Sequence, residues 1–96
     1  MKVLHRIGIV SLIIFAYAAT SAEADEYAVV GVQNYLQVHR APREGSDVLV
    51  RIPRTVSEIT GYPASSAESA DGQKWILIEW HGITGYVNKS YVEKIH

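Results

Sequence analysis

The sequence has 96 residues and no cysteine. Disulfide bridges, cysteine nucleophiles and a cysteine-linked lipid anchor are therefore not expected. Proline occurs only three times, and residues 25–96 contain no phenylalanine. No long helical pattern occurs beyond residue 24. A domain this small has a core that supplies only ~3–5 kcal/mol of net stability, so it depends on well-packed strands.

The chain also lacks a strong charge of either sign. Its formal net charge is −1, and residues 25–96 carry seven Lys and Arg against nine Asp and Glu. Proteins that bind nucleic acid or anionic membranes usually carry a basic excess. We therefore expect no nucleic-acid partner.

The N-terminus has the pattern of a secretory signal peptide. Lys2 and Arg6 precede an apolar run of thirteen residues, Ile7–Ala19, and Ala22-Glu23-Ala24 offers a small-residue cleavage site. The pattern predicts a signal peptide over residues 1–24, a single domain over residues 25–96, and a periplasmic or secreted location.

Two alternatives to this interpretation remain open. Cleavage after Thr20-Ser21-Ala22 would remove two residues fewer. An uncleaved membrane anchor is the other, but thirteen apolar residues fall short of the ~20 that a spanning helix needs. We expect no stable membrane insertion after cleavage.

The remaining residues read as short strands separated by turn signals. The expected strands are Tyr27–Val32, Tyr35–Arg40, Val48–Ile52, Val56–Tyr62, two within Lys74–Val92, and Tyr91–Ile95. Gly61 is expected at a bulge or a strand end. Pro63–Gln73 is small and polar, and we expect a mobile loop there. Short strands without a helix predict an all-β fold, a small antiparallel barrel or sandwich.

The strongest local signal is a hairpin with its turn at His81-Gly82. Such two-residue turns need positive φ, which Gly adopts freely and His tolerates. Alternation along the first strand sets Trp75 and Trp80 on opposite faces, with Trp80 beside Ile76 and Ile78. We therefore expect one tryptophan to be partly exposed. Periodicity alone would bury Trp80 beside the two isoleucines, but which tryptophan faces outward stays open.

Four motifs, in order, resemble the bacterial SH3-like (SH3b) domain family. The family patterns L-N-V-R-x-G-P, V-[IL]-x-x-[IL]-P, W-x-x-V-x-Y-N-G-x-x-G-[WY]-V and S-Y-[LV] are matched by Leu36–Pro42, Val48–Pro53, Trp75–Val87 and Ser90–Val92. The resemblance covers about residues 27–95. It implies an SH3-like barrel of five to seven short antiparallel strands that acts as a binding module.

The sequence departs from that pattern near the start and after the second motif. Gln37 and His39 replace Asn and Arg, Ala41 replaces Gly, and Arg54-Thr55-Val56 replaces a Lys-Gly-Thr-like turn. These positions lie on loops or exposed faces, where a ligand would be selected. Exported members of the family commonly bind peptidoglycan or protein partners and usually perform no chemistry.

Residues for catalysis or metal binding are sparse. Beyond residue 24 the histidines are His39, His81 and His96, without a metal-binding spacing. The carboxylates are scattered, whereas a glycosidase needs two at a fixed separation across a cleft. We expect no catalytic residue, no metal site, no cofactor and no enzymatic activity.

Aromatic residues are the better indication of a site, because Tyr and Trp combine apolar area with a polar tip. The candidate ligand-binding residues are Tyr35, His39, Tyr62, Trp80 and Tyr86. Arg40 and Arg43 could pair with a carboxylate of a peptide stem, although a position on a solvated loop is the favoured interpretation for both.

Two functions remain. The first is a monomeric, exported SH3b-type module that contacts peptidoglycan or another cell-envelope component. The alternative is a periplasmic protein–protein interaction module, an adaptor or an inhibitor of an envelope enzyme, that uses a strand edge or the Pro63–Gln73 segment.

Overall fold

The computed structural model describes residues 23–95. Residues 1–22, which hold nearly all of the predicted signal peptide, lie outside the described part, so the export signal stays a prediction. No helix within residues 23–95 is both long and apolar enough to cross a membrane.

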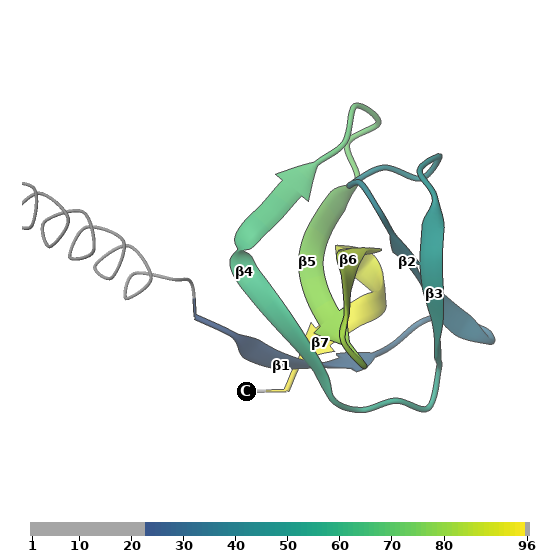
Figure 1. The fold of residues 1–96 in the computed structure, drawn as a ribbon, viewed down its shortest axis with the longest axis vertical. Helices are drawn as coiled ribbons and strands as arrows, with labels where there is room; N and C mark the ends of the chain where they lie inside the picture. Colours follow the sequence, from purple (N-terminus) through teal and green to yellow (C-terminus); the bar gives the residue numbers. More distant parts are fainter. Residues whose placement is uncertain (1–22, 96) are drawn as a thin grey trace, which may run out of the picture.

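The described chain forms one curled antiparallel sheet of seven strands, which confirms the predicted all-β fold class (Figure 1). The strands are β1 (Asp25–Val29), β2 (Tyr35–His39), β3 (Val48–Pro53), β4 (Ile59–Glu68), β5 (Lys74–Trp80), β6 (Ile83–Asn88) and β7 (Val92–Lys94), with a 3-10 turn, η1 (Lys89–Tyr91), before β7. Their order across the sheet is β3-β2-β6-β5-β4-β1-β7.

The predicted hairpin is the β5–β6 pair. Trp80 lies opposite Ile83, so the connection is the two residues His81 and Gly82. Their φ angles are 52° and 79°, the only consecutive positive pair among the described residues. Positive φ at both centres suits a turn whose twist matches that of the flanking strands, which confirms the prediction made at His81-Gly82.

The prediction of a mobile loop over Pro63–Gln73 is wrong. β4 continues through Glu68, and Ser66, Ala67 and Glu68 pair with the start of β5. The register shifts between Tyr62 and Ser66, so the irregularity expected at Gly61 falls just after it. Backbone pairing does not require apolar side chains, and this is why a polar segment could form a strand; the true turn is confined to residues 69–73.

The other boundaries shift by a few residues. β1 covers Asp25–Val29 instead of Tyr27–Val32, and β4 begins at Ile59, three residues later than expected. The segment before it forms a turn in which the backbone N–H of Val56 donates to the carbonyl of Pro53.

The core lies on the concave side of the sheet. Ile76 and Ile78 of β5 are fully buried there beside Val87 of β6, and the whole cluster is Tyr27, Val29, Leu36, Val38, Ile52, Ile59, Ile76, Ile78, Val87 and Val92. Trp80 packs against this cluster and is partly buried. Trp75, 1% exposed, lies on the opposite face of β5 and outside the cluster. The expectation of one partly exposed tryptophan is confirmed, and that residue is Trp80.

Gly85 brings β2 and β6 close together. A Cβ atom at Gly85 would lie 2.6 Å from Cγ1 of Val38 and 2.8 Å from the carbonyl oxygen of His39. The missing side chain allows His39 to pair directly with Tyr86. This close approach sets His39 of β2 beside β6, and His39 also lines the pocket described below.

Candidate functional site

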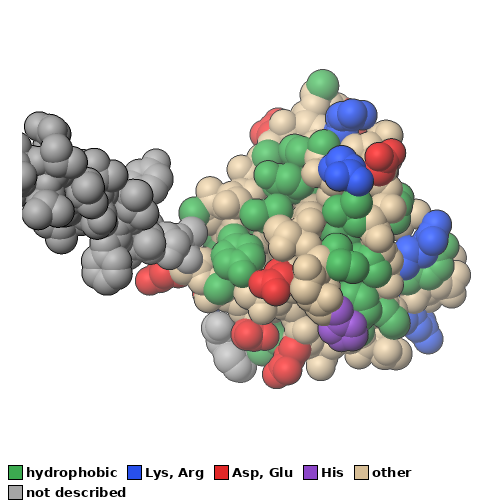
Figure 2. Space-filling model, viewed as in Figure 1, with side chains coloured by type: hydrophobic (Ala, Val, Ile, Leu, Met, Phe, Trp, Pro, Cys, Tyr) green, Lys and Arg blue, Asp and Glu red, His purple; other side chains and the backbone are tan. Residues whose placement is uncertain are grey.

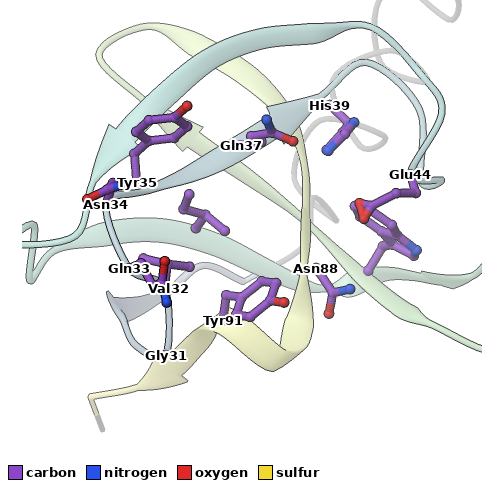
Figure 3. A pocket seen from close by; sticks show the side chains of 12 residues that line it. Gly31, Val32, Gln33, Asn34, Tyr35, Gln37, His39, Glu44, Asn88 and Tyr91 are labelled. Carbon is purple, nitrogen blue, oxygen red and sulfur yellow. The ribbon is translucent and has the colours of Figure 1, made fainter.

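One pocket of about 440 Å³ opens beside the N-terminal half of β2 (Figure 3). Its wall comes from the segment before and within β2, the β2–β3 loop, the start of β5, the end of β6 and η1. The lining residues are Gly31, Val32, Gln33, Asn34, Tyr35, Leu36, Gln37, His39, Glu44, Trp75, Asn88 and Tyr91.

Trp75 and His39 form the buried part of the pocket. Their ring centroids are 5.3 Å apart and the ring planes are inclined by 81°, an edge-to-face contact. Nε1 of Trp75 donates a hydrogen bond of 3.0 Å to Oγ of Ser69. Trp75 also lies opposite Asn88 in the β5–β6 register, so these two side chains share one face of the sheet.

His39 is 3% exposed and fixed by the β2–β3 loop. Its Nδ1 lies 3.1 Å from the carbonyl oxygen of Ser46, and a carbonyl can only accept, so Nδ1 carries the proton. Neutral His39 therefore presents Nε2 as an acceptor. Within residues 23–95 no side-chain nitrogen or oxygen that is sealed from solvent lacks a hydrogen-bond partner. Nε2 makes no recorded hydrogen bond, so it reaches solvent, and His39 lines the pocket.

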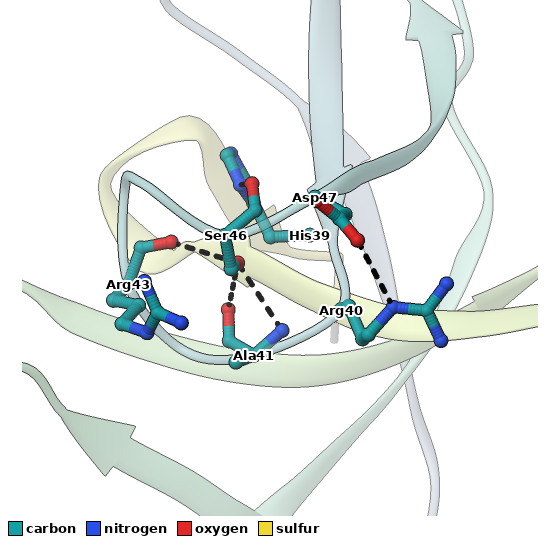
Figure 4. Close-up of polar contacts among 6 residues, drawn as sticks. All are labelled: His39, Arg40, Ala41, Arg43, Ser46 and Asp47. Carbon is teal, nitrogen blue, oxygen red and sulfur yellow. Dashed lines mark hydrogen bonds and ion pairs between the residues drawn. The ribbon is translucent and has the colours of Figure 1, made fainter.

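Ser46 holds the β2–β3 loop together (Figure 4). Its hydroxyl accepts from the backbone N–H of Ala41 at 3.2 Å and lies 2.9 Å from the carbonyl of Ala41 and 3.0 Å from that of Arg43. In the same loop Arg40 forms an exposed ion pair of 3.6 Å with Asp47. The loop therefore has a defined shape, and it carries Glu44 to the pocket.

Asn88, at the end of β6, is hydrogen-bonded both to η1 and to Gln73, the residue just before β5. It is 9% exposed. Its Oδ1 accepts from the backbone N–H of Ser90 at 2.9 Å, which caps η1, and its Nδ2 donates to Oε1 of Gln73 at 2.9 Å. The cap fixes the turn that presents Tyr91, a 39% exposed side chain on the pocket rim.

The structure brings two of the five predicted site residues into this pocket. Tyr35 and His39 line it, whereas Tyr62, Trp80 and Tyr86 lie elsewhere. Trp80 stacks on His81, with ring centroids 3.9 Å apart. Arg40 and Arg43 do not line the pocket either. The one formally charged side chain of the lining is Glu44, which is negative, whereas the sequence suggested positively charged arginines.

Tyr62 and Tyr86 form a separate row with Leu77. Both tyrosines lie opposite Leu77, one on each neighbouring strand, so the three side chains share a face of the sheet and all are partly buried. The Tyr62 hydroxyl donates to Oε1 of Glu79 at 3.3 Å. Desolvation, followed by the charge of Glu79, raises the pKa of Tyr62.

The visible surface divides by charge. Figure 2 shows hydrophobic side chains across the middle of one face, with Lys and Arg toward the β2–β3 side and most Asp and Glu on the side of β1 and β4. Among residues 23–95 no group of three or more His, Asp or Glu could hold a metal ion.

Sequence reasoning missed Glu44, Asn88 and Tyr91, and it left open whether Trp75 or Trp80 is the exposed tryptophan. A signal existed for two of them. Asn88 stands two residues before Ser90, the spacing at which an Asn side chain caps the following turn, and Tyr91 falls within the Ser90–Val92 motif. Glu44 lies on an irregular loop whose fold depends on Ser46, and no periodicity would point to it.

Comparison with models of known protein families, with curated proteins and with solved structures gave no match.

Proposed function

We propose that this protein is an exported, monomeric, non-catalytic binding module of the SH3b type that holds peptidoglycan in the pocket above Trp75. The pocket is the observation that carries the proposal. A cavity of about 440 Å³, walled by Tyr35, Tyr91 and a set of polar side chains, is of the size of pockets that hold small ligands.

The architecture also supports a binding role. The pocket wall is formed by loops and strand ends that a rigid sheet positions, which is where binding residues are generally found. The His39–Trp75 contact and the Asn88 cap fix the wall before any ligand arrives, so binding would cost little ordering entropy. The ordered motifs that resemble SH3b domains point to the cell wall as the target.

Export is the first part to test. The full chain is expressed with a C-terminal tag in a bacterial host, and the tagged protein in each cell fraction is analysed by mass spectrometry. We expect a periplasmic or secreted product that begins at Asp25, or at Glu23 if the earlier site is used. A tagged product that stays in the cytoplasm with Met1 retained would contradict export.

Sedimentation with purified sacculi tests the cell-wall function. We expect the purified protein to co-sediment at low salt, and a Tyr35→Ala/Tyr91→Ala double variant to remain in the supernatant, because both rings stand on the pocket rim. Tyr62→Phe is the matched control, since Tyr62 lies outside the pocket, and it should sediment like the wild type. A folded wild-type protein that does not sediment would overturn the cell-wall function.

A free strand edge favours the alternative, a protein–protein interaction module. β3 pairs with β2 alone, and Val48 at its start is 38% exposed. An unpaired edge can accept an extended segment of another protein as an additional strand. One stoichiometric protein captured from envelope extract, lost when Val50 is replaced by Pro in an otherwise folded domain, would support this alternative in place of peptidoglycan.

A further inference from the structure

Most hydrogen-bond donors at the base of the pocket are already used within the protein. The N–H of Trp75 donates to Ser69, and the amide nitrogen of Asn88 donates to Gln73. Nδ1 of His39 donates to the carbonyl of Ser46. The N–H of Trp75 and the Nδ1–H of His39 are therefore not free to bind an anionic or carbonyl-rich ligand, and Asn88 keeps one of its two amide N–H bonds free.

Two free groups in the same region can act only as acceptors. Nε2 of His39 reaches the pocket as an unprotonated nitrogen when the ring is neutral. The carboxylate of Glu44 lies beside it on the wall and is exposed (Figure 3). The amides of Gln33, Asn34 and Gln37 offer donors and acceptors equally and so favour neither kind of ligand.

Glu44 has no counter-ion within the described chain. The ion pairs found there are Arg40 with Asp47 and Lys94 with Asp25. Arg43, the neighbour of Glu44, does not line the pocket. The lining thus carries one negative charge and no positive one, and a concave wall focuses that field on whatever enters.

The aromatic rim suits a cation as well. Tyr35 and Tyr91 flank the opening, and the guanidinium carbon of Arg51 already lies 5.2 Å from the centroid of the Tyr35 ring. Arg51 thus occupies one face of the Tyr35 ring, whereas within residues 23–95 no cation lies over the Tyr91 ring, whose face can receive an ammonium group.

We infer that the pocket recognises a primary ammonium group, with Glu44 as its counter-ion and Nε2 of His39 as a second acceptor. The inference deepens the proposed function and rests on it for the natural ligand: the peptidoglycan partner would be a stem peptide with a free side-chain amine. A charge-assisted hydrogen bond to Glu44 would orient the stem, while the aromatic rim covers its aliphatic part.

The test uses a small probe, so that it does not depend on the cell wall. Nα-acetyl-lysine amide, which has a free side-chain amine, is titrated into the 15N-labelled protein, and Nα,Nε-diacetyl-lysine amide is titrated in parallel. We expect only the first compound to shift the indole N–H signal of Trp75 and the backbone signals around Glu44. The Glu44→Gln variant should bind it at least fivefold more weakly.

Glu58→Gln is the matched control, because Glu58 is also an exposed loop carboxylate but lies outside the pocket. It should bind the probe like the wild type. Glu44 makes no recorded side-chain hydrogen bond, so Glu44→Gln should fold normally, which an unchanged melting temperature would establish. Equal shifts with both compounds, no shift with either, or unchanged binding by Glu44→Gln would overturn the inference.

Sacculi then separate this inference from the proposed function. Chemical acetylation of their free amines should reduce sedimentation of the wild type at least fivefold and leave the residual binding of Glu44→Gln unchanged. Strong binding to native and acetylated sacculi alike would retain the peptidoglycan function and reject ammonium recognition. If the protein binds the probe but does not sediment with sacculi, ammonium recognition is retained and the peptidoglycan function is rejected.

Discussion

His39 and Trp75 meet edge to face, 5.3 Å between ring centroids, although one residue belongs to β2 and the other to β5. β6 lies between these strands in the sheet, so the contact spans it on the face opposite the core. It links the indole at the base of the pocket to the β2–β3 loop through the hydrogen bond from His39 to Ser46. Changes in the loop can therefore alter the pocket floor.

The two tryptophans should differ in fluorescence. In Trp80→Phe the remaining Trp75 is 1% exposed, so its emission should be blue-shifted and resist quenching by acrylamide. In Trp75→Phe the remaining Trp80, partly exposed beside His81, should be quenched several times more efficiently. Circular dichroism controls for folding. Equal quenching in the two variants would contradict the assigned faces.

Truncation of Trp75 should be costly. Removal of a large buried aromatic side chain leaves a cavity and typically costs ~3–5 kcal/mol. We expect Trp75→Ala to lose most of the stability measured by urea denaturation, whereas Tyr91→Ala, on the exposed rim, should lose little. If Trp75→Ala unfolds at nearly the wild-type urea concentration, Trp75 is not the packed floor of the pocket.

The β5–β6 turn gives a test of backbone conformation. Gly82 has φ 79° and open space around it, so Gly82→Val should destabilise the fold by at least ~1 kcal/mol through strain alone. His81→Asn serves as the control because Asn tolerates the φ of 52° found there. A Gly82→Val protein with an unchanged melting curve would exclude this turn.

A side chain added at Gly85 tests whether β2 and β6 lie as close together as the structure shows. The Cβ atom of Gly85→Ala would collide with Val38 and with the backbone of His39. Such overpacking typically costs ~1–3 kcal/mol. The variant should also move the NMR signals of His39 and Trp75. Gly45→Ala, whose nearest neighbour is an Arg43 side-chain nitrogen at 3.7 Å, should leave the stability unchanged; an equal loss of stability in the two variants would show that the contact at Gly85 is absent.

Stability should fall at alkaline pH. Burial, followed by the nearby charge of Asp25, raises the pKa of Tyr27 above its ordinary value of 10.0. The folded state therefore keeps the phenol proton more tightly than the unfolded chain, and this contribution is present below pH 10 and is lost as the pH rises through the raised value. Urea unfolding between about pH 9 and 11 should show the decline, and Tyr27→Phe should lessen it. A decline of the same slope in Tyr27→Phe would assign it to other groups.

The hairpin was predictable because its turn has a strict conformational requirement that His81-Gly82 meets, and because the flanking apolar residues alternate. The extent of β4 was not predictable, since Ser66 to Glu68 contribute backbone pairing instead of apolar burial. Alternation set the two tryptophans on opposite faces, and by itself it would have buried Trp80. Trp75 is the more buried of the two because it is covered by His39, a residue 36 positions away, which alternation does not reveal.

Sequence reasoning could predict only those pocket residues whose side-chain type alone suggests binding. Tyr35 and His39 were found in this way, as an aromatic residue and a polar residue on an alternating strand. Glu44 enters the pocket because Ser46 folds the β2–β3 loop, and Tyr91 because Asn88 caps η1. Both depend on side-chain-to-backbone hydrogen bonds that sequence spacing only partly specifies.

The pairing of β1 with β7 has a consequence for biosynthesis. β7 closes one side of β1 through the register of Tyr27 with Lys94 and Val29 with Val92, and the N–H of Ile95 donates to the carbonyl of Glu26. A nascent chain cannot form these contacts until residues 92–95 have left the ribosome, and contacts so distant in sequence form slowly. β1 therefore lacks its β7 neighbour during most of the synthesis of the chain, although β4, β5 and β6 can pair earlier.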